Sequence, residues 1–244
     1  MTNKVIVIIQ TGQAIPSALE KHGDFNEWFI KAMNIDSSQT KTFRVFEQLI
    51  FPDPDSIAGI IITGSASMVT QELDWSEKTI EWLRQFLHMS IPILGVCYGH
   101  QLLARLLGGN VDWNPLGREI GQTNVQLNQH AKHDDLFKDL INNNIRNPDF
   151  YATHLQSVVQ LPRDVTLLGI TNLDPYHCFR YKSHIWGLQF HPEFTSAIIS
   201  EYIHARSDEM ASEGIDPNVK LSEINSRTFG NELLIKFKDI CFST

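Results

Sequence analysis

Clusters of basic residues and long hydrophobic runs are both missing from this sequence. Its 20 Lys and Arg against 28 Asp and Glu give a formal net charge of −8, and no run of Lys or Arg occurs. A surface that neutralises phosphates is therefore not expected, which argues against nucleic-acid binding. The first apolar run, Val5 to Ile9, spans five residues, and no small-residue cleavage site follows it. The opening segment thus predicts a buried strand, and neither a signal peptide nor a membrane span.

Cysteine is also scarce. The three cysteines are Cys97, Cys178 and Cys241, an odd number at long and irregular spacings. This pattern excludes a disulfide framework and contains no metal-knuckle spacing. A reducing cytoplasm is the simplest expected location for such a chain.

What the sequence does contain is enough apolar material for one well-packed domain or two small ones, with 244 residues of which 42% are hydrophobic. Short β-branched runs alternate with helical patterns, which indicates parallel strands joined by crossover helices. The strand candidates in the first half are nearly continuous apolar runs at residues 5–9, 43–50, 57–63 and 91–96. They predict an α/β fold with a doubly wound, mostly parallel sheet flanked by helices, as in flavodoxin-like proteins.

The helix expected between the last two of these strands opens at Asp74, with Glu77 three residues on as a capping box. After residue 110 the strands become shorter and alternate in hydrophobicity, which predicts a small antiparallel section. They cover residues 123–127, 165–170, 177–181 and 185–190, with a short helix near 134–141.

The end of the chain has a helical pattern. It predicts helices at residues 196–211 and 231–241, with a loop at 214–218 between them. We therefore expect a main domain over residues 1–195 and a C-terminal helical extension over 196–244, packed on the same domain. A surface for docking a partner is the alternative interpretation of this extension.

The segment Gly95-Val-Cys97-Tyr-Gly99 carries the strongest chemical signal, since a buried strand runs into it and a Leu-rich helix leaves it. This is the layout of a nucleophile elbow, whose flanking glycines remove Cβ atoms that would clash. At a helix N-terminus the Cys97 thiolate is favoured by the helix dipole, and the Tyr98 N–H points to where an oxyanion forms. A small buried cysteine packed against the sheet is the alternative interpretation.

A thiolate nucleophile needs a base, and His191 is the histidine that follows a strand end. Pro192 stops the strand after it, and residues i and i+2 of an extended segment lie on the same side, so Glu193 can reach His191. A satisfied surface histidine is the alternative for a lone His before Pro. Combined with the elbow, the pattern favours a Cys–His–Glu arrangement.

Together these segments resemble the class I (triad) glutamine amidotransferases, from about residue 40 to about residue 195. The resemblance rests on the elbow at Cys97, on Phe190-His191-Pro-Glu193-Phe194, and on Ile62-Thr-Gly64-Ser65-Ala-Ser67 after an earlier strand. It is greatest to stand-alone members similar to the glutaminase domain of GMP synthase. The resemblance implies that Cys97 is the nucleophile, His191 the general base and acid, and Glu193 its orienting partner.

The same resemblance implies the other site residues. The Ser65 and Tyr98 N–H groups would form the oxyanion hole, with Gly64 in the same turn. The substrate-binding positions implied are Gly64, Gln101 and the segment Thr153, His154 and Leu155, whose backbone holds the α-amino and α-carboxyl groups. The implied reaction hydrolyses the γ-amide of glutamine through a γ-glutamyl thioester on Cys97, without a metal or an organic cofactor.

Three positions depart from the family pattern or leave a role open. Ser65 stands where many members have a second glycine, which narrows the pocket. Gln156 replaces an acidic residue, and an uncharged side chain would recognise an α-ammonium group less well. Glu119, in the segment Gly117-Arg-Glu-Ile-Gly121, is expected behind the elbow, with a structural ion pair as the alternative.

The chain shows no Gly-x4-Gly-Lys-Ser/Thr loop and no Ser-Gly-Gly-x-Asp-Ser loop, so the sequence predicts no ATP-dependent activation of an acceptor. One hypothesis is a glutamine-hydrolysing amidotransferase that acts alone or passes ammonia to a separate synthetase subunit. A second is a γ-glutamyl peptide or amide hydrolase with the same triad, and a third is a catalytically silent binding or regulatory protein. In the enzyme hypotheses the substrate is a small molecule, and neither nucleic acid nor a membrane is an expected partner.

Overall fold

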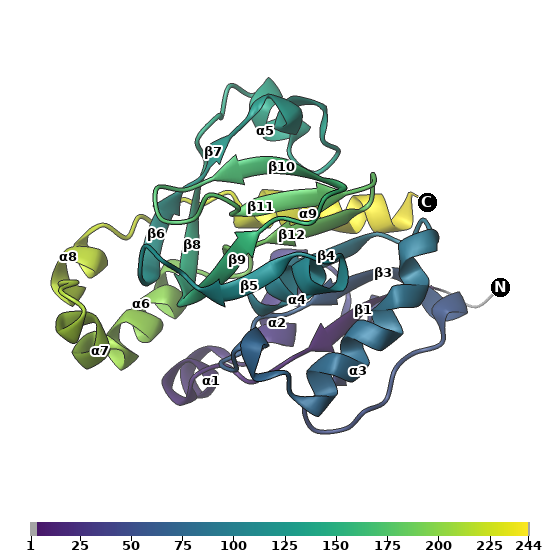
Figure 1. Ribbon diagram of the computed structural model, residues 1–244, viewed down its shortest axis with the longest axis horizontal. Coiled ribbons are helices and arrows are strands. Elements are labelled where there is room, and N and C mark those ends of the chain that lie inside the picture. The colour runs from purple at the N-terminus through teal and green to yellow at the C-terminus, as the bar shows by residue number, and fades with distance from the viewer. Residues whose placement is uncertain (1–3, 244) are drawn as a thin grey trace.

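A mostly parallel sheet forms the centre of the computed structural model, which describes residues 4–243 (Figure 1). Its eight strands are hydrogen-bonded in the order β2-β1-β3-β4-β12-β11-β10-β7. The strands that run parallel to their neighbours are β1 (Val5–Gln10), β2 (Thr40–Arg44), β3 (Ile57–Ile62), β4 (Ile93–Val96) and β12 (Ile185–Leu188). The strands that extend the sheet in antiparallel fashion are β11 (Cys178–Tyr181), β10 (Val165–Ile170) and β7 (Gln126–Leu127). The predicted α/β class is confirmed.

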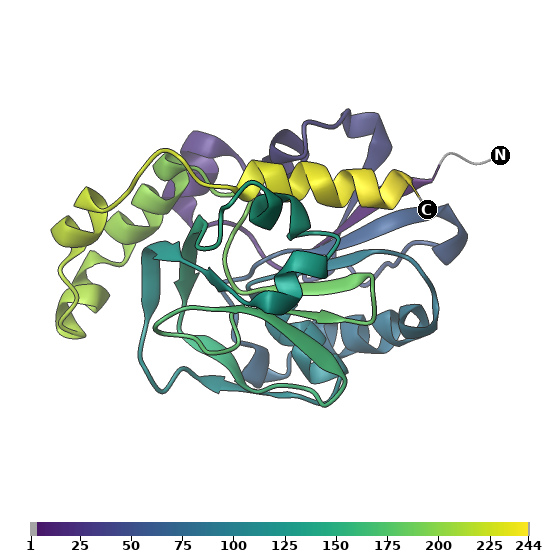
Figure 2. The same ribbon diagram turned by 90° about the horizontal axis from the view of Figure 1, so that it is seen from above.

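Helices cover both faces of this sheet, which is why its central strands are apolar on both sides; all six residues of β3 are buried. One face packs against α2 (Phe25–Ala32) and α9 (Gly230–Phe242), and the other against α3 (Asp74–Leu83) and α4 (Tyr98–Leu106). In Figure 2 the yellow α9 and the blue α3 lie on opposite sides of the sheet.

A third apolar cluster lies beyond the carboxyl ends of the parallel strands. Its helices are α1 (Pro16–His22), α6 (Ser196–Ala205) and α7 (Ser207–Ser212), and α8 (Pro217–Ser222) packs against α6. Two antiparallel ribbons stand beside them, β5 (Asn110–Trp113) with β9 (Gln156–Gln160) and β6 (Glu119–Asn124) with β8 (Asp149–His154). The remaining helices are short: α5 (Lys138–Asn142), η1 (Ser37–Gln39), η2 (Pro54–Ser56), η3 (Val69–Gln71), η4 (Arg84–His88) and η5 (Gln129–His133).

The strand predicted at residues 43–50 is wrong, because β2 ends at Arg44 and a turn follows it. As the edge strand of the sheet, β2 is only partly buried and alternates Thr with Lys, so a continuous apolar run does not mark it. The run that suggested a strand contributes Val45 to the core and leaves Leu49 and Ile50 exposed.

Two helix predictions also need correction. Asp74 is the first residue of α3 and not its cap; it pairs with Lys78, while Glu77 reaches Arg105 instead of closing a capping box. The helix predicted at residues 196–211 is broken at Arg206, whose ψ of 15° and φ of −113° end α6 before α7 begins.

The last helix, α9, shares the core of the main sheet. Leu233, Leu234 and Phe237 of α9 lie in the same apolar cluster as Ile8 of β1 and Leu94 of β4. The division of the chain into residues 1–195 and a C-terminal extension stays a prediction. Within residues 4–243 no helix combines the length and the hydrophobicity needed to cross a membrane.

Candidate active site

Three neighbouring parallel strands, β3, β4 and β12, deliver the predicted residues to one edge of the sheet. Gly64 and Ser65 follow β3, Cys97 follows β4 directly, and His191 comes shortly after β12. Val96 and Leu188 are register partners in adjacent strands, so the chain segments that follow them emerge side by side. Ligands of open α/β sheets bind at this carboxyl edge.

Cys97 lies at a sharp turn between β4 and α4. Its φ of 52° and ψ of −100° are outside the favoured regions for a residue with a side chain, and its N–H donates to Leu188 O at 2.8 Å. The turn packs tightly: a Cβ on Gly95 would lie 2.4 Å from Gly99 O, and one on Gly99 would lie 2.4 Å from Ile62 O. The predicted elbow, with glycines on both sides for steric reasons, is present.

His191 and Glu193 lie together in the buried space beside Cys97. The Nδ1 of His191 is 2.7 Å from Oε1 of Glu193, and both side chains are buried. The imidazole stacks on Phe194 at a ring separation of 4.0 Å, and its backbone N–H donates to Tyr151 O at 2.7 Å. The ring is therefore held with Nδ1 toward the carboxylate, which leaves Nε2 for a partner on the other side.

Cys97 lines the same cavity as His191, and the charge and hydrogen bonding of His191 act on the pKa of the Cys97 thiol. Burial raises the pKa of the Cys97 thiol, but the charge of His191, the hydrogen bond and the charge of His154 outweigh it and lower the pKa below its usual value. Burial by itself lowers the pKa of His191, yet the charges of Glu193 and Cys97 raise it to about 10. The arrangement favours a thiolate paired with an imidazolium.

Cys178 and Cys241 lack such partners. Burial raises the pKa of the Cys178 thiol, with Asp134 adding to the effect, and burial also raises the pKa of Cys241. Both are free and buried. Among the three thiols, Cys97 is therefore the one in a reactive environment.

The Gly64–Ser65 turn lies against the His191 ring. A Cβ on Gly64 would lie 2.8 Å from Cε1 of His191, so this close approach requires glycine. The Ser65 hydroxyl accepts the Ser67 N–H at 3.1 Å and is turned along its own loop, while Tyr98 donates its hydroxyl to Ser76 at 2.7 Å. Neither polar side chain is directed at Cys97, so any oxyanion donors here are the backbone N–H groups.

Two small cavities meet at Cys97. The cavity on the α4 side has a volume of about 100 Å³ and is lined by Gln101 and the segment from Thr153 to Gln156. The amide nitrogen of Gln101 donates to Gln156 O at 2.7 Å and to Gln189 Oε1 at 3.0 Å. Thr153 also approaches the nucleophile, since its carbonyl oxygen lies 3.8 Å from Cys97 Sγ. Of the predicted substrate-binding positions, Gln101, Thr153, His154 and Leu155 line this cavity, whereas Gly64 is not among its lining residues.

Gln156, which departs from the family pattern, does not have a free side chain. Its amide nitrogen donates to Thr70 Oγ1 at 2.6 Å, and its Oε1 accepts from the Thr70 N–H at 3.5 Å. No side-chain carboxylate lines this cavity among the described residues. Recognition of an α-ammonium group by a carboxylate side chain is therefore not built into this cavity.

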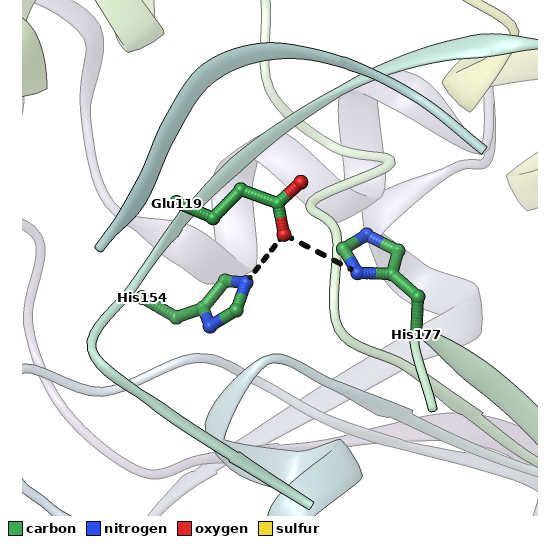
Figure 3. A group of neighbouring side chains, drawn as sticks. All are labelled: Glu119, His154 and His177. Carbon is green, nitrogen blue, oxygen red and sulfur yellow. Dashed lines mark hydrogen bonds and ion pairs between the residues drawn. The ribbon is translucent and has the colours of Figure 1, made fainter. Parts of the chain in front are cut away.

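Glu119 lies in a buried polar cluster behind the substrate segment, as Figure 3 shows with His154 and His177. Its Oε2 is 2.9 Å from Nε2 of His154 and 3.5 Å from Nδ1 of His177. Thr123 donates to its other oxygen at 2.6 Å. Burial alone would raise the pKa of Glu119, but the charges of His177 and His154 and these hydrogen bonds lower it to about 2.

His154 faces oxygen acceptors on both sides of its ring, since its Nδ1 lies 3.0 Å from Gln156 O. The predicted substrate role of His154 therefore falls to its backbone, because its ring is held by Glu119 and Gln156.

The atoms of Glu119, His154 and His177 that could ligate a metal ion lie within 4.8 Å of one another. His177, to which the sequence pattern gave no role, also has its Nδ1 3.6 Å from Asp174 Oδ2. Burial lowers the pKa of His177, but Glu119 and Asp174 raise it overall. The cluster thus brings the side chains of two histidines close to those of two carboxylates.

Sequence reasoning missed two arginines that reach the cavities. Arg118 is bound by Glu213 at 2.7 Å and by Glu209 at 2.9 Å, contacts that hold α7 against the β6 ribbon. Arg206, at the break between α6 and α7, lines both cavities beside Cys97. Arg118 precedes Glu119 in the segment Gly117-Arg-Glu-Ile-Gly121, but no sequence pattern points to Arg206.

Known proteins with similar sequences and folds bear on this site. Residues 15–206 match the family described as glutamine amidotransferase class-I. Gamma-glutamyl peptidase 4 of Arabidopsis thaliana is 27% identical over 190 residues, which cover 76% of this chain and 74% of the relative. GMP synthase [glutamine-hydrolyzing] of Clostridium perfringens is 32% identical over 136 residues, which cover 55% of this chain and 24% of that protein.

Among solved structures, the crystal structure of a glutamine amidotransferase from Thermotoga maritima superimposes with a TM-score of 0.76 at 20% identity, covering 99% of this chain and all of the other. This likeness supports the fold. The match over residues 15–206 includes the strand ends, the elbow and the His191 segment described above. The chain belongs to the class I glutamine amidotransferase family.

Proposed function

We propose that this protein is a cysteine hydrolase that cleaves γ-glutamyl amide bonds through a thioester on Cys97. The observation that carries the proposal is the buried His191–Glu193 pair, with its 2.7 Å contact, in the same cavity wall as a cysteine on a strained strand-to-helix turn. Nucleophile, base and orienting carboxylate are the parts that covalent acyl transfer requires.

In the proposed first step, the Cys97 thiolate attacks the γ-carbonyl carbon of the substrate, and the carbonyl oxygen becomes an oxyanion. The backbone N–H groups of Ser65 and Tyr98 are the proposed donors to this oxyanion. When the tetrahedral intermediate collapses, the carbon–nitrogen bond breaks and the imidazolium of His191 gives its proton to the departing nitrogen.

The second step releases the acid. His191, now neutral, takes a proton from water, and the resulting hydroxide attacks the thioester carbon. The carbon–sulfur bond breaks, glutamate leaves, and Cys97 returns as the thiolate beside the imidazolium. Glu193 keeps its position at Nδ1 throughout and stabilises the positive charge of the ring.

Two substrate classes share this chemistry. Glutamine is the first, with ammonia released or passed to a separate synthetase; the similarity to GMP synthase supports it, although the match covers 24% of that protein. γ-Glutamyl peptides or amides are the second, supported by a relative named γ-glutamyl peptidase that matches over 74% of its length. A cavity next to Cys97 with His191 in its wall favours the second class, because a departing ammonia molecule alone would not need a cavity there.

A substrate panel tests the proposal. Purified protein is given glutamine, a γ-glutamyl dipeptide and a γ-glutamyl alkylamide, and released glutamate is measured for the wild type and for Cys97→Ser. The proposal predicts turnover of at least one compound by the wild type and none by the variant. Turnover of the dipeptide without turnover of glutamine would exclude the glutamine-hydrolysing hypothesis and support the γ-glutamyl peptidase hypothesis.

A catalytically silent protein is the remaining alternative. A glutamine-like electrophile distinguishes it, because labelling needs a reactive thiolate next to a γ-glutamyl site. We expect Cys97 to be labelled and Cys178 and Cys241 to stay free. Binding of glutamine without labelling of Cys97 would support the silent alternative.

A further inference from the structure

A second cavity adjoins Cys97, and half of its lining residues differ from those of the first. It has a volume of about 40 Å³, and His191 belongs to its wall but not to the wall of the larger cavity. The two cavities share the segment from Ser65 to Ala66, Cys97, Thr153 and Arg206. A molecule that extends across Cys97 would therefore place one end in each cavity.

The proposed chemistry determines which cavity holds the departing amine and which holds the acyl part of the substrate. The general acid must reach the nitrogen that leaves, so the departing amine lies on the His191 side. The acyl part then lies in the larger cavity, with Gln101 and the segment from Thr153 to Leu155. The smaller cavity is thus positioned to receive what is attached to the nitrogen.

The wall of the smaller cavity is mostly uncharged and contains one arginine. Ile15, Phe25 and Tyr202 supply apolar surface, and Gln13 supplies an amide. Apart from the Cys97–His191 pair, Arg206 is the charged residue among the described residues that line it, and none of these has a carboxylate side chain. Apart from the Cys97–His191 pair, a group bound here meets the cation of Arg206 and no carboxylate side chain of the wall.

The Arg206 guanidinium has N–H donors available to bind a group in this cavity. One nitrogen, Nη1, lies 3.3 Å from Oε2 of Glu209, whose side chain is 54% exposed. A guanidinium carries five N–H donors, and an exposed pair of this kind contributes little free energy. The break between α6 and α7 fixes its backbone, because the Arg206 N–H donates to Tyr202 O at 3.2 Å at the end of α6.

We propose that the cavity on the His191 side is a leaving-group subsite in which Arg206 binds a carboxylate of the departing amine. The substrates it favours are γ-glutamyl conjugates of amino acids or short peptides, and simple alkylamides or glutamine itself fit it less well. This inference rests on the proposed function. In the step concerned, the thiolate–carbon bond forms, the carbon–nitrogen bond breaks, His191 supplies the proton, and the amine leaves with its carboxylate still on Arg206.

The test compares two substrates that differ in one carboxylate, γ-glutamylglycine and γ-glutamylethylamide, with glutamine as a third. For Arg206→Gln we expect kcat/KM on γ-glutamylglycine to fall about 10- to 100-fold, mainly through KM, as for loss of a charge-assisted hydrogen bond. The values for the other two substrates should change less than about threefold. Arg206→Lys, which keeps the charge but not the planar donor pair, should recover part of the loss.

Arg84→Gln is the matched control, since it removes the same charge from an exposed residue of η4, which leads to the amino end of β4. It should leave all three substrates unaffected. Equal losses on all three substrates with Arg206→Gln would mean that Arg206 binds the glutamyl part, and no loss on any would also overturn the subsite.

A measurement on the wild type keeps the inference testable if the variants do not fold. The γ-glutamyl thioester can be trapped by added amines, and glycine should be a better acceptor than ethylamine at the same concentration of free amine. Equal trapping would contradict the subsite while the thioester chemistry stands. If the wild type releases glutamate from none of the three substrates, the proposed function fails and the subsite with it.

Discussion

His154 and Glu119 form a buried pair with 2.9 Å between Nε2 and Oε2, directly behind the segment that lines the Cys97 cavity. The pair fixes the ring of His154, whose other nitrogen binds the carbonyl oxygen of Gln156 at 3.0 Å. It therefore holds the turn between β8 and β9 in place beside the Cys97 cavity. Glu119 acts on the site through His154 and does not reach the reacting atoms itself.

Replacing Glu119 with Gln tests this role. Removing the charge of a buried paired carboxylate should lower the free energy of unfolding by about 3 kcal/mol, because His154 and His177 lose their common partner. Glu223→Gln, which breaks the exposed pair with Lys220, is the control and should change stability by less than about 0.5 kcal/mol. Chemical denaturation of both variants provides the measurement, and equal small changes would contradict the role.

The same pair predicts a pH dependence of stability. The pKa of Glu119 is lowered from 4.5 to about 2 in the folded protein. Its stabilising contribution is therefore complete above pH 4.5, where the unfolded carboxyl is ionised too, and is lost as the pH falls toward 2. The difference in unfolding free energy between wild type and Glu119→Gln should shrink over this interval. If the difference in unfolding free energy between wild type and Glu119→Gln grows as the pH falls, the predicted direction of the pH dependence is wrong.

The reactivity of Cys97 should also follow the pH in a particular way. Its thiol pKa is lowered by His191, whose own pKa is raised to about 10. Alkylation of Cys97 should thus begin below pH 9, the ordinary range of a thiol, and His191→Ala should move its onset upward. Since the two groups titrate together, the observed midpoints belong to the pair. Alkylation that begins only near pH 9 in the wild type would contradict the ion pair.

Glu193 and His191 should differ in the size of their effects. His191→Ala removes the proton carrier and should lower kcat by about 10⁴-fold. Glu193→Gln keeps an oxygen that can accept a hydrogen bond from His191 Nδ1. Its loss of kcat should therefore be about a hundredfold smaller than that of His191→Ala. Steady-state kinetics on the best substrate of the panel measures both, and equal losses would mean that the role of Glu193 is misassigned.

Part of this site could be predicted from the sequence, for physical reasons. Strands β1, β3 and β4 are buried on both faces, so their apolar runs mark them, and the elbow glycines around Cys97 are required by contacts as close as 2.4 Å. The spacing of His191 and Glu193 placed both on one side of an extended segment, and the structure brings them together. Local geometry was sufficient at these positions.

The rest depended on contacts between distant segments. The partners of Glu119 come from three other segments of the chain, at His154, Thr171 and His177, and no local pattern connects them. The break at Arg206 interrupts a sequence that reads as one helix, and α7 is held in its new direction by Glu213 on Arg118. The edge strand β2 lacked the apolar run by which the central strands were predicted.

The central claim is that Cys97 carries the γ-glutamyl group during the reaction, and mass spectrometry of the acid-quenched enzyme tests it most directly. With a substrate of the panel in excess, we predict a γ-glutamyl adduct on the peptide that contains Cys97, removable by hydroxylamine as a thioester should be. The adduct and the release of glutamate should both disappear in Cys97→Ser and persist in Cys178→Ser. Release of glutamate by Cys97→Ser at the wild-type rate would contradict the account.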